Sequence, residues 1–380
     1  MNLKFFSEFV RDKFNTNEFI PLHVPTFIGN EEKYVNNTIK STFVSSVGKY
    51  VDKFELDLSS FLKAKRSVAV VNGTSALQIA LKLAGVKEND EVITQSLTFV
   101  ATANAIKYNN AHPVFVDVDI DTMGLSPTAL ANFLDEFGDI RKDGCYNKFS
   151  GRRIGACMPM HSFGFPVHID ELVIVCNKWN IPIVEDAAEA LGSKYKNIYT
   201  GNFGLISAIS FNGNKIATTG GGGAIITNNE SIANKAKHIT TTAKTPHPYE
   251  YHHDELGYNF RMPNLNAALG CAQLENLNFF LKSKRNLANE YNEIFKSNSI
   301  KFRTELKNTV ANYWLMCIEL ENRRDRDVFL QKTNKNNIMT RPIWQLMHRL
   351  PMYKNCQKDE QINSIFLEDR IVNIPSSARI

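Results

Sequence analysis

The chain has 380 residues, 43% of them hydrophobic, so it can bury a large core and more than one domain is expected. Its net charge of +5 is modest for this length, and basic residues are interleaved with acidic ones, which argues against a nucleic-acid-binding protein. The six cysteines are scattered and form no CxxC pair, so neither a disulfide framework nor a zinc site is expected.

The first residues, 1–14, are apolar but interrupted by charged side chains, and they lack the hydrophobic region of a signal peptide. No apolar run is long enough to cross a bilayer, so we expect a cytoplasmic protein that does not bind membranes. A cluster of His247, His252 and His253 has no regular ligand spacing, and a polar surface loop is favoured over a metal site. No metal is therefore predicted.

Short β-branched runs alternate with longer amphipathic segments from residue 66 onward. The alternation predicts strands at 66–71, 91–95, 112–119, 152–160, 181–187, 205–211 and 223–228. Helices are predicted at 75–86, 99–109 and 168–180, with a further helix that begins at Ser126 and Pro127. Strands separated by helices imply an α/β fold, with right-handed crossovers and a mainly parallel sheet covered by helices on both faces.

The pattern weakens after about residue 230. Residues 262–295 predict one long helix or a broken pair, 313–320 a strand and 325–335 a helix. We therefore expect a large α/β domain at 1–255 and a smaller α+β domain at 256–380, against which the N-terminal segment packs.

Three motifs carry chemistry. In VVNGTSALQIA (70–80), a strand ends in a glycine turn and a helix begins near Thr74 and Ser75, where free N–H groups can bind an anion. By itself this motif is more often an ordinary capped turn. Glu185 and Asp186 end an apolar strand, at the edge where open α/β sheets bind ligands. A helix cap, a metal ligand and a partner for a cationic ring nitrogen all remain open for them.

Lys215 follows a strand and precedes four consecutive glycines, Gly220–Gly223. Such a run costs backbone entropy, which indicates a sharp turn or a close backbone approach. A nucleotide-binding loop is the competing interpretation, but the lysine precedes the glycines and no GxGxxG spacing is present.

Taken in this order, the three motifs resemble the fold-type I enzymes that use pyridoxal phosphate (PLP), and among them the DegT/DnrJ/StrS sugar aminotransferase family. The stretches 45–55, 98–106, 158–170 and 255–275 look like the same family, so the resemblance covers nearly the whole chain. It implies that Lys215 binds PLP as a Schiff base and then moves protons, and that Asp186 pairs with the ring nitrogen.

The resemblance also implies further contacts to the cofactor. Gly73, Thr74, Ser75 and Ser210 would hold the phosphate, Phe99 would stack on the ring, Glu189 would lie near the 3′-oxygen, and Asn212 would lie close by. For Phe99 a core position stays open, and for Glu189 a structural salt bridge. Asn259 resembles a residue that reaches the PLP phosphate of a partner subunit, which implies a homodimer with shared active sites.

The stretch TRPIWQLMHRLPMY (340–353) resembles a LegC-like subgroup that makes 4-amino-4,6-dideoxy nucleotide sugars. The resemblance implies transfer of an amino group from L-glutamate to the C4 ketone of a UDP-linked 4-keto-6-deoxy-N-acetylhexosamine, for a cell-surface glycan. The candidate substrate contacts are His161, Tyr313, Arg341, Trp344 and His348, with Arg341 suited to a diphosphate. A 3-aminotransferase stays open. A 3-dehydratase is disfavoured because such relatives carry histidine in place of the lysine, and a non-catalytic regulator is disfavoured because the motifs are intact.

Overall fold

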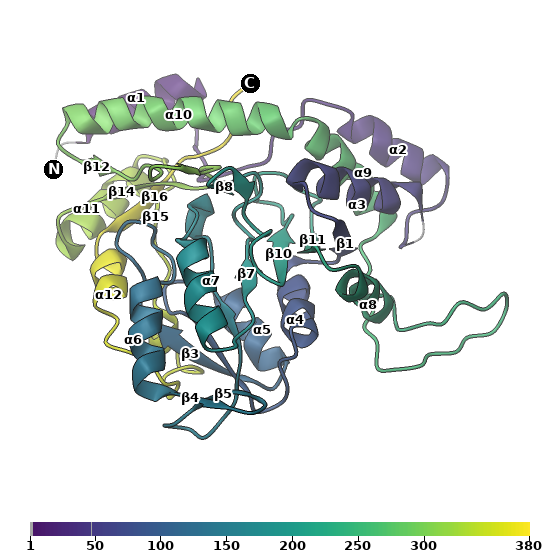
Figure 1. The fold of residues 1–380 in the computed structure, drawn as a ribbon. Coiled ribbons are helices and arrows are strands. Elements are labelled where there is room, and N and C mark those ends of the chain that lie inside the picture. The colour runs from purple at the N-terminus through teal and green to yellow at the C-terminus, as the bar shows by residue number, and fades with distance from the viewer. Residues whose placement is uncertain (1–2, 47) are drawn as a thin grey trace.

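The computed structural model describes residues 3–46 and 48–380. Figure 1 shows a large sheet-and-helix body with a smaller sheet and the long helix α10 lying across one end. The predicted α/β class is confirmed, because two groups of strands, all but one running in the same direction, join edge to edge and carry helices on both faces.

The main sheet combines two groups of strands. The first has the order β1 (Arg66–Val70), β11 (Gly223–Thr227), β10 (Ile206–Ser210), β7 (Val184–Asp186). The second has the order β6 (Ile154–Met158), β2 (Glu91–Gln95), β3 (His112–Val116). Parallel bridges from Cys157 to Ile183 and from Met160 to Asp186 join β6 to β7. Only β11 runs antiparallel to its neighbours, so the carboxyl ends of the other strands meet at one edge.

Two apolar cores cover the two faces of this sheet. One contains side chains of α4 (Gly73–Leu83), α5 (Val100–Tyr108) and α8 (Glu230–Thr240), and the other those of α6 (Pro127–Phe137) and α7 (Ile169–Lys178). The predicted start of α6 is confirmed, because Ser126 Oγ accepts a hydrogen bond from the Ala129 N–H. Helix α4 begins earlier than predicted, since Asn72 rather than Thr74 caps it.

The C-terminal part has its own sheet. Its order is β12 (Lys301–Phe302), β14 (Met316–Glu319), β16 (Ile371–Ile374), β15 (Arg341–Pro342), with α11 (Arg323–Lys335) and α12 (Ile362–Glu368) nearby. The long apolar stretch forms the broken pair α9 (Asn264–Glu275) and α10 (Leu277–Ser297), interrupted at Asn276. The N-terminal α1 (Lys4–Phe14) packs here, with the Phe6 ring 5.7 Å from Phe295 and 5.2 Å from Phe329.

Several elements were not predicted. Two helices, α2 (Glu31–Lys40) and α3 (Lys49–Leu62), pack on α9. Strands β4 (Gly138–Arg141) and β5 (Gly144–Asn147) form a hairpin. A small sheet contains β13 (Thr309–Val310), β8 (Lys194–Tyr195) and β9 (Ile198–Tyr199). The short 3-10 turns are η1 (Ser162–Gly164) and η2 (Met347–Arg349). One apolar core runs from α3 through α9 and α10 into the C-terminal sheet, so the boundary between residues 255 and 256 stays a prediction.

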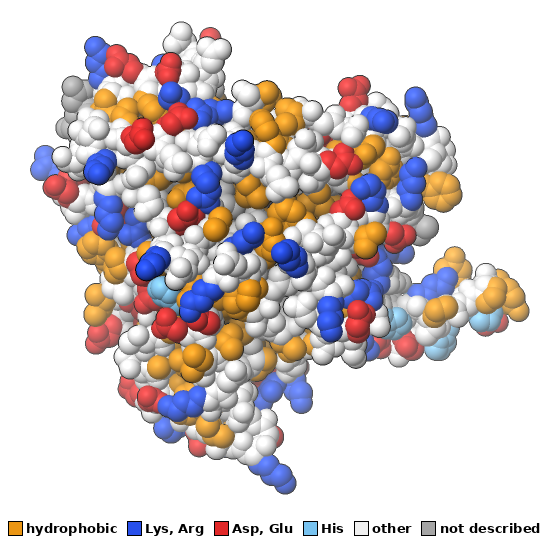
Figure 2. All heavy atoms as spheres, turned by 45° about the horizontal axis from the view of Figure 1, so that its top comes forward, with side chains coloured by type: hydrophobic (Ala, Val, Ile, Leu, Met, Phe, Trp, Pro, Cys, Tyr) orange, Lys and Arg blue, Asp and Glu red, His pale blue; other side chains and the backbone are white. Residues whose placement is uncertain are grey.

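An arm, residues 241–261, joins α8 to α9 and extends away from the body (Figure 1). Antiparallel bridges from Thr241 to Asn259 and from Lys244 to His253 hold its two sides together. Its end displays Tyr249 and Tyr251, each 81% exposed, and Figure 2 shows the hydrophobic and histidine side chains gathered there. Within the described residues no helix is both long enough and apolar enough to span a bilayer.

Candidate active site

A cavity of about 650 Å³ opens between the carboxyl edge of the main sheet and the C-terminal sheet. This is the edge at which an open α/β sheet binds its ligands. Ten residues predicted from the sequence line it: Gly73, Thr74, Phe99, Asp186, Glu189, Ser210, Asn212, Lys215, Arg341 and Trp344. Tertiary folding therefore brings together residues that lie far apart in the sequence, with Gly73 and Trp344 separated by 271 positions.

Lys215 lies in the wall of the cavity, after the turn that leaves β10. Its Nζ donates to Oε1 of Glu189 at 3.2 Å and sits 3.7 Å from the centre of the Trp314 ring. Only 9% of the residue is exposed. The amine is therefore held at a defined point, with an acid on one side and an aromatic face on the other.

Asp186 ends β7 and is almost completely buried. Its Oδ2 accepts a hydrogen bond from Thr102 Oγ1 at 2.7 Å, and its Oδ1 accepts one from the Ala188 N–H at 3.1 Å. Burial raises the pKa of this carboxyl group, although the two hydrogen bonds oppose that effect. A buried carboxylate at this place is stabilised further by any cationic group that enters the cavity.

Glu185 faces the opposite side of the sheet, as the two-residue period of a strand requires. Its oxygens accept hydrogen bonds from the N–H groups of Gly201, Phe203 and Gly204, and one lies 3.0 Å from His161 Nε2. Although burial alone would raise the pKa of Glu185, these partners lower it. Glu185 thus holds the loop before β10 and does not line the cavity.

Glu189 is the second acid in the cavity and is 3% exposed. Desolvation raises its pKa to about 7, even though Lys215 and the N–H of Phe163 act in the opposite direction. Phe163 has a φ of 57°, which is unusual for a phenylalanine, and it turns its N–H toward Glu189 at 2.9 Å. The backbone is strained at the point where it positions this acid.

The amino end of α4 forms an anion cradle. Asn72 Oδ1 accepts from the Ser75 N–H, which leaves the N–H groups of Gly73 and Thr74 without an acceptor among the described residues. A Cβ on Gly73 would lie 2.9 Å from Ser210 Cβ, so a side chain there would enter the cradle. These free donors, with the Thr74 and Ser210 hydroxyls, fit a phosphate group.

The glycine run has two separate structural reasons. A Cβ on Gly223 would lie 2.5 Å from the Asn72 carbonyl oxygen, so the chain passes too close to the cradle for any side chain. Gly220 has a φ of 78°, in the left-handed region. Both of the expected causes, close approach and a sharp turn, are thus present.

Five predicted site residues lie outside the lining of the cavity in this single chain. They are Ser75, His161, Asn259, Tyr313 and His348. Ser75 is buried in the first turn of α4, where its N–H is used by the Asn72 cap. Asn259 lies exposed in the arm, where its Oδ1 accepts a hydrogen bond from Arg261.

Three of these residues, the expected substrate contacts His161, Tyr313 and His348, have their polar side-chain atoms bonded within the chain. His161 has no exposed surface, and its Nε2 and Nδ1 are taken by Glu185 and the Val167 N–H. The Tyr313 hydroxyl accepts from the Glu305 N–H, and its ring packs edge-on against Phe165.

His348 points at Ser96, whose Oγ lies 2.8 Å from its Nδ1. Burial lowers the pKa of His348 to about 4, so this ring is neutral at physiological pH. None of the three side chains lines the cavity in this single chain, and their contacts to substrate stay predictions.

Several lining residues were missed. Trp314 lines the cavity, whereas its neighbour Tyr313, which has a φ of 51°, packs its ring against Phe165. Thr102 lies in the first turn of α5, three residues after Phe99, the residue that precedes the helix. Asn373, from β16, had no signal in the sequence, since only the C-terminal sheet brings it here.

An aromatic wall faces the acids. Phe99 is 48% exposed at the cavity, its ring centre lies 6.3 Å from that of Trp344, and Trp344 stacks on Phe163 at 4.6 Å. Exposed aromatic faces of this kind suit a planar ring or a sugar. The cavity thus has apolar aromatic surface as well as the polar side chains of Asp186, Glu189 and Lys215.

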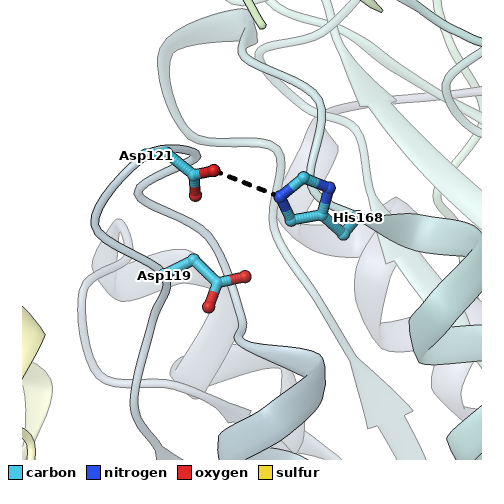
Figure 3. Close-up of side chains that lie close together, drawn as sticks. All are labelled: Asp119, Asp121 and His168. Carbon is cyan, nitrogen blue, oxygen red and sulfur yellow. Dashed lines mark hydrogen bonds and ion pairs between the residues drawn. The ribbon is translucent and has the colours of Figure 1, made fainter. Parts of the chain in front are cut away.

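Two groups of side chains in the described part of the chain have metal-ligand atoms close together. Figure 3 shows Asp119, Asp121 and His168, whose Nε2 lies 3.3 Å from Asp121 Oδ2, and the other group is His238, Asp254 and Glu255. In both groups the histidine already bonds to a carboxylate. Neither lines the cavity, and a role in tying loops together accounts for both.

Comparison with known proteins agrees with this site. The DegT/DnrJ/EryC1/StrS aminotransferase family matches residues 25–380. A GDP-perosamine synthase of Escherichia coli O157:H7 is 35% identical, over 94% of this chain and 93% of its own. A UDP-2-acetamido-2-deoxy-3-oxo-D-glucuronate aminotransferase of Pseudomonas aeruginosa is 30% identical, over 78% of each chain. A solved DegT DnrJ EryC1 StrS aminotransferase from Brucella abortus superposes with a TM-score of 0.81 at 26% identity, over 91% of this chain and 90% of that one.

The fold and the site define a PLP-dependent aminotransferase that acts on nucleotide-linked sugars. Its residues fit the cofactor, since an anion cradle, a buried carboxylate and a lysine line one cavity beside aromatic faces. The chain belongs to the DegT/DnrJ/EryC1/StrS aminotransferase family.

Proposed function

We propose that this aminotransferase moves the amino group of L-glutamate to the C4 ketone of a 4-keto-6-deoxyhexose carried by a nucleoside diphosphate, for a surface glycan made in the cytoplasm. A UDP-linked N-acetylhexosamine is the first candidate acceptor, because residues 340–353 resemble the subgroup that makes such sugars. A GDP-linked sugar is the second, because a relative named GDP-perosamine synthase aligns with 94% of the chain.

The observation that carries the proposal is the placement of Lys215. Its Nζ lies against Glu189 and Trp314 in the wall of the cavity that Asp186 and the anion cradle also line. Bound PLP supplies an aldehyde for covalent attachment and a ring that accepts electrons. Lys215 would provide the attaching amine and then hold and return the proton at the reacting carbon.

The other residues support this exchange. The cradle of Gly73, Thr74 and Ser210 would hold the phosphate, and Asp186 would keep the ring nitrogen protonated. Phe99 would cover a ring face, with Asn212 close by. Trp344 and Arg341 line the cavity from the C-terminal part of the chain, and they would contact the substrates.

We also propose a homodimer with shared active sites. The arm leaves the body with two tyrosines that are 81% exposed, and it returns to the end of β1 through a bridge from Arg261 to Val70. A second chain would cover such an apolar, projecting segment. Asn259, two residues before that bridge, would then reach the phosphate held by the partner subunit.

The test uses PLP-loaded protein, L-glutamate and a panel of UDP-, GDP- and dTDP-linked keto-sugars. The product is identified by mass and NMR, and formation of 2-oxoglutarate is followed in parallel. We expect one 4-ketone to be aminated and the Lys215→Ala variant to be inactive on the whole panel. Amination of a 3-ketone alone would replace the proposal with the 3-aminotransferase, which the P. aeruginosa relative's name favours. No amination of any sugar would contradict it.

A further inference from the structure

The acid and the amine that meet in the cavity come from two separate segments, and a third segment bonds to both of them. Glu189 follows β7, and Lys215 follows β10. The third segment, residues 311–315, leads into β14 of the C-terminal part and places Trp314 in the wall of the cavity. The bonds that this segment makes therefore bear directly on how the acid and the amine face each other.

Trp314 contacts the lysine and its backbone at two points. Its indole Nε1–H donates to the backbone carbonyl of Asn214 at 2.7 Å, and Asn214 directly precedes Lys215. The Lys215 Nζ lies 3.7 Å from the centre of the indole ring. One buried side chain thus fixes the backbone at which the lysine begins and gives its amine an aromatic face on which to rest.

Asn312 holds the segment that carries the acid. Its Nδ2 donates to the carbonyl oxygens of Glu189 and Leu191, each at 2.9 Å, and its Oδ1 accepts from the Trp314 N–H at 2.8 Å. Asn312 is buried, so the loss of any of these bonds would leave a polar group unpaired away from water. The same amide therefore ties the backbone of Glu189 to the backbone of Trp314.

The segment is itself anchored close to the acid. Just before it, β13 pairs with β8, and the Asn312 N–H donates to Ser193 Oγ at 3.0 Å. The Ser193 hydroxyl in turn donates to the Gly164 carbonyl at 2.7 Å. Gly164 belongs to the turn in which the Phe163 N–H bonds to the Glu189 carboxylate. The side chains of Asn312 and Trp314 therefore start from a backbone that is already fixed relative to Glu189.

A purely structural role is the competing interpretation, because both residues are buried and bonded. Trp179 provides a comparison, since it is also a buried indole beside a lysine, with the Lys178 Nζ 5.6 Å from its ring centre. Trp179 packs in the core between sheet and helices and does not line the cavity. Trp314 differs because it lines the cavity and because its two contacts converge on Lys215.

We infer that Asn312 and Trp314 are positioning residues, through which the C-terminal part of the chain sets the place of the Lys215 amine relative to Glu189. This inference rests on the proposed role of Lys215 and deepens it. The amine lies 3.2 Å from Glu189 Oε1. A lysine side chain has many rotamers, and one without these contacts would leave that position for most of the time. A small displacement of a reacting group costs rate, because reaction needs a defined approach.

The test compares covalent with non-covalent binding to the cofactor-free protein. Covalent attachment of PLP needs the Lys215 amine in place. Its rate is followed by quenching samples with borohydride and measuring the attached cofactor, and the residue that carries it, by mass spectrometry. Pyridoxamine phosphate has the same ring and phosphate but no aldehyde. Its affinity, measured by calorimetry, therefore reports the cavity without the covalent bond.

Trp314→Phe keeps an aromatic face but removes the indole N–H, and it should slow PLP attachment about 5- to 10-fold, as expected for the loss of one hydrogen bond. Trp314→Leu removes both contacts and should slow attachment further. Asn312→Ala should also slow it, and Trp314→Phe decides the test should Asn312→Ala fail to fold. The affinity of Trp314→Phe for pyridoxamine phosphate should change by less than about threefold. Trp179→Phe is the matched control and should leave the rate and the affinity unchanged.

Two results would overturn the inference. One is a rate of PLP attachment in both Trp314 variants that equals the rate of the parent protein. The other is a loss of affinity for pyridoxamine phosphate in Trp314→Phe that matches its loss of rate, which would show that the indole only maintains the cavity. Cofactor attached to a residue other than Lys215 in the parent protein would instead contradict the proposed function, and the inference with it.

Discussion

At the scale of single residues, the proposed chemistry depends on the Lys215 amine and on two buried acids that line the same cavity. Asp186 and Glu189 are both almost fully buried, and both have raised pKa values because burial disfavours their charged forms. They differ in their partners. Asp186 is held by a hydroxyl and a backbone N–H, whereas Glu189 contacts the Lys215 amine directly. The two acids should therefore have separable roles.

Replacing Lys215 by alanine should reduce turnover by about 1,000-fold or more, because the variant loses both the covalent anchor and the proton carrier. The fold should remain, since the Lys215 side chain borders a cavity and fills no core. Turnover, thermal unfolding and mass spectrometry after borohydride treatment would check this. Cofactor fixed to another residue with steady turnover would disprove the assignment.

Asp186→Asn should weaken PLP binding and turnover more than Glu189→Gln does. The asparagine cannot supply the negative charge that keeps a ring nitrogen protonated, and we expect a loss of about tenfold or more in affinity. Fluorescence titration of each apo variant with PLP measures the effect. The opposite ranking would mean that the two carboxylates have exchanged roles.

The free energy of unfolding of the cofactor-free protein should change with pH because Glu189 titrates. Its pKa rises from an ordinary value of 4.5 to about 7 in the folded state, so between these values the folded protein binds a proton that the unfolded chain has lost. Stability therefore falls as pH rises through this window, and Glu189→Gln should remove about 2–3 kcal/mol of that fall.

Urea unfolding of the apo protein and of Glu189→Gln at pH 4.5 to 7.5 provides the measurement. Glu321→Gln, at an exposed position, is the control and should follow the parent curve. If the parent and Glu189→Gln curves run parallel across the window, the carboxyl group does not titrate there.

At the scale of elements, the acid is positioned by a turn that only certain residues allow. Phe163 and Gly164 both have positive φ, at 57° and 91°, which directs the Phe163 N–H to Glu189. A Cβ on Gly164 would lie 1.8 Å from Asn312 Oδ1, and Asn312 in turn bonds to the Glu189 carbonyl. This turn and the segment that carries Glu189 therefore depend on each other.

Gly164→Ala should lower the free energy of unfolding by about 3 kcal/mol or more, because a steric clash adds to backbone strain. Gly85→Ala is the matched control, with a φ of 90° and no neighbour within 4 Å of the added Cβ, and should cost only about 1–2 kcal/mol. Chemical denaturation of both variants checks this. Equal losses would show that the contact with Asn312 is easily relieved.

At the scale of the whole molecule, the site combines two sheets, and we expect a second chain to complete it. The chain presents its cavity between the main sheet and the C-terminal sheet. The arm extends away from the body and exposes aromatic residues at its end (Figures 1 and 2), and Asn259 lies exposed at its base, bridged to Thr241. In solution the particle should have twice the chain mass of 43.0 kDa.

Mixing two inactive variants should test whether each active site uses residues of both chains. If Asn259 serves the partner, Asn259→Ala and Lys215→Ala chains that are unfolded and refolded together should recover about a quarter of the parent activity, because half of the dimers then contain one intact site. Light scattering verifies the dimer. No recovery despite confirmed mixed dimers would show that each site uses only its own chain.

Local sequence was sufficient for most of the main sheet. The predicted strand at 91–95 and helix start at Ser126 agree with the structure, because alternating apolar runs and a serine–proline cap act over a few residues. It was also sufficient for the order of the cradle, acid and lysine, since each follows a strand whose carboxyl end meets the same edge. The helices α2 and α3, which pack on α9 more than 200 positions away, were missed, although Phe54, Leu58 and Leu62 of α3 recur at helical spacing.

The sequence by itself thus determined the fold class, the family and the residues Lys215, Asp186 and Thr74 at one sheet edge. Only the tertiary structure decided that Trp314 and not Tyr313 faces the cavity, that His161 is enclosed behind the sheet, and that Arg341 stands beside Asn373. The physical reason is the distance along the sequence over which the deciding interactions act. Strand ends and helix caps are set by neighbours in the chain, whereas the position of Arg341 beside Asn373 is set by pairing between β15 and β16, strands that are distant in the sequence.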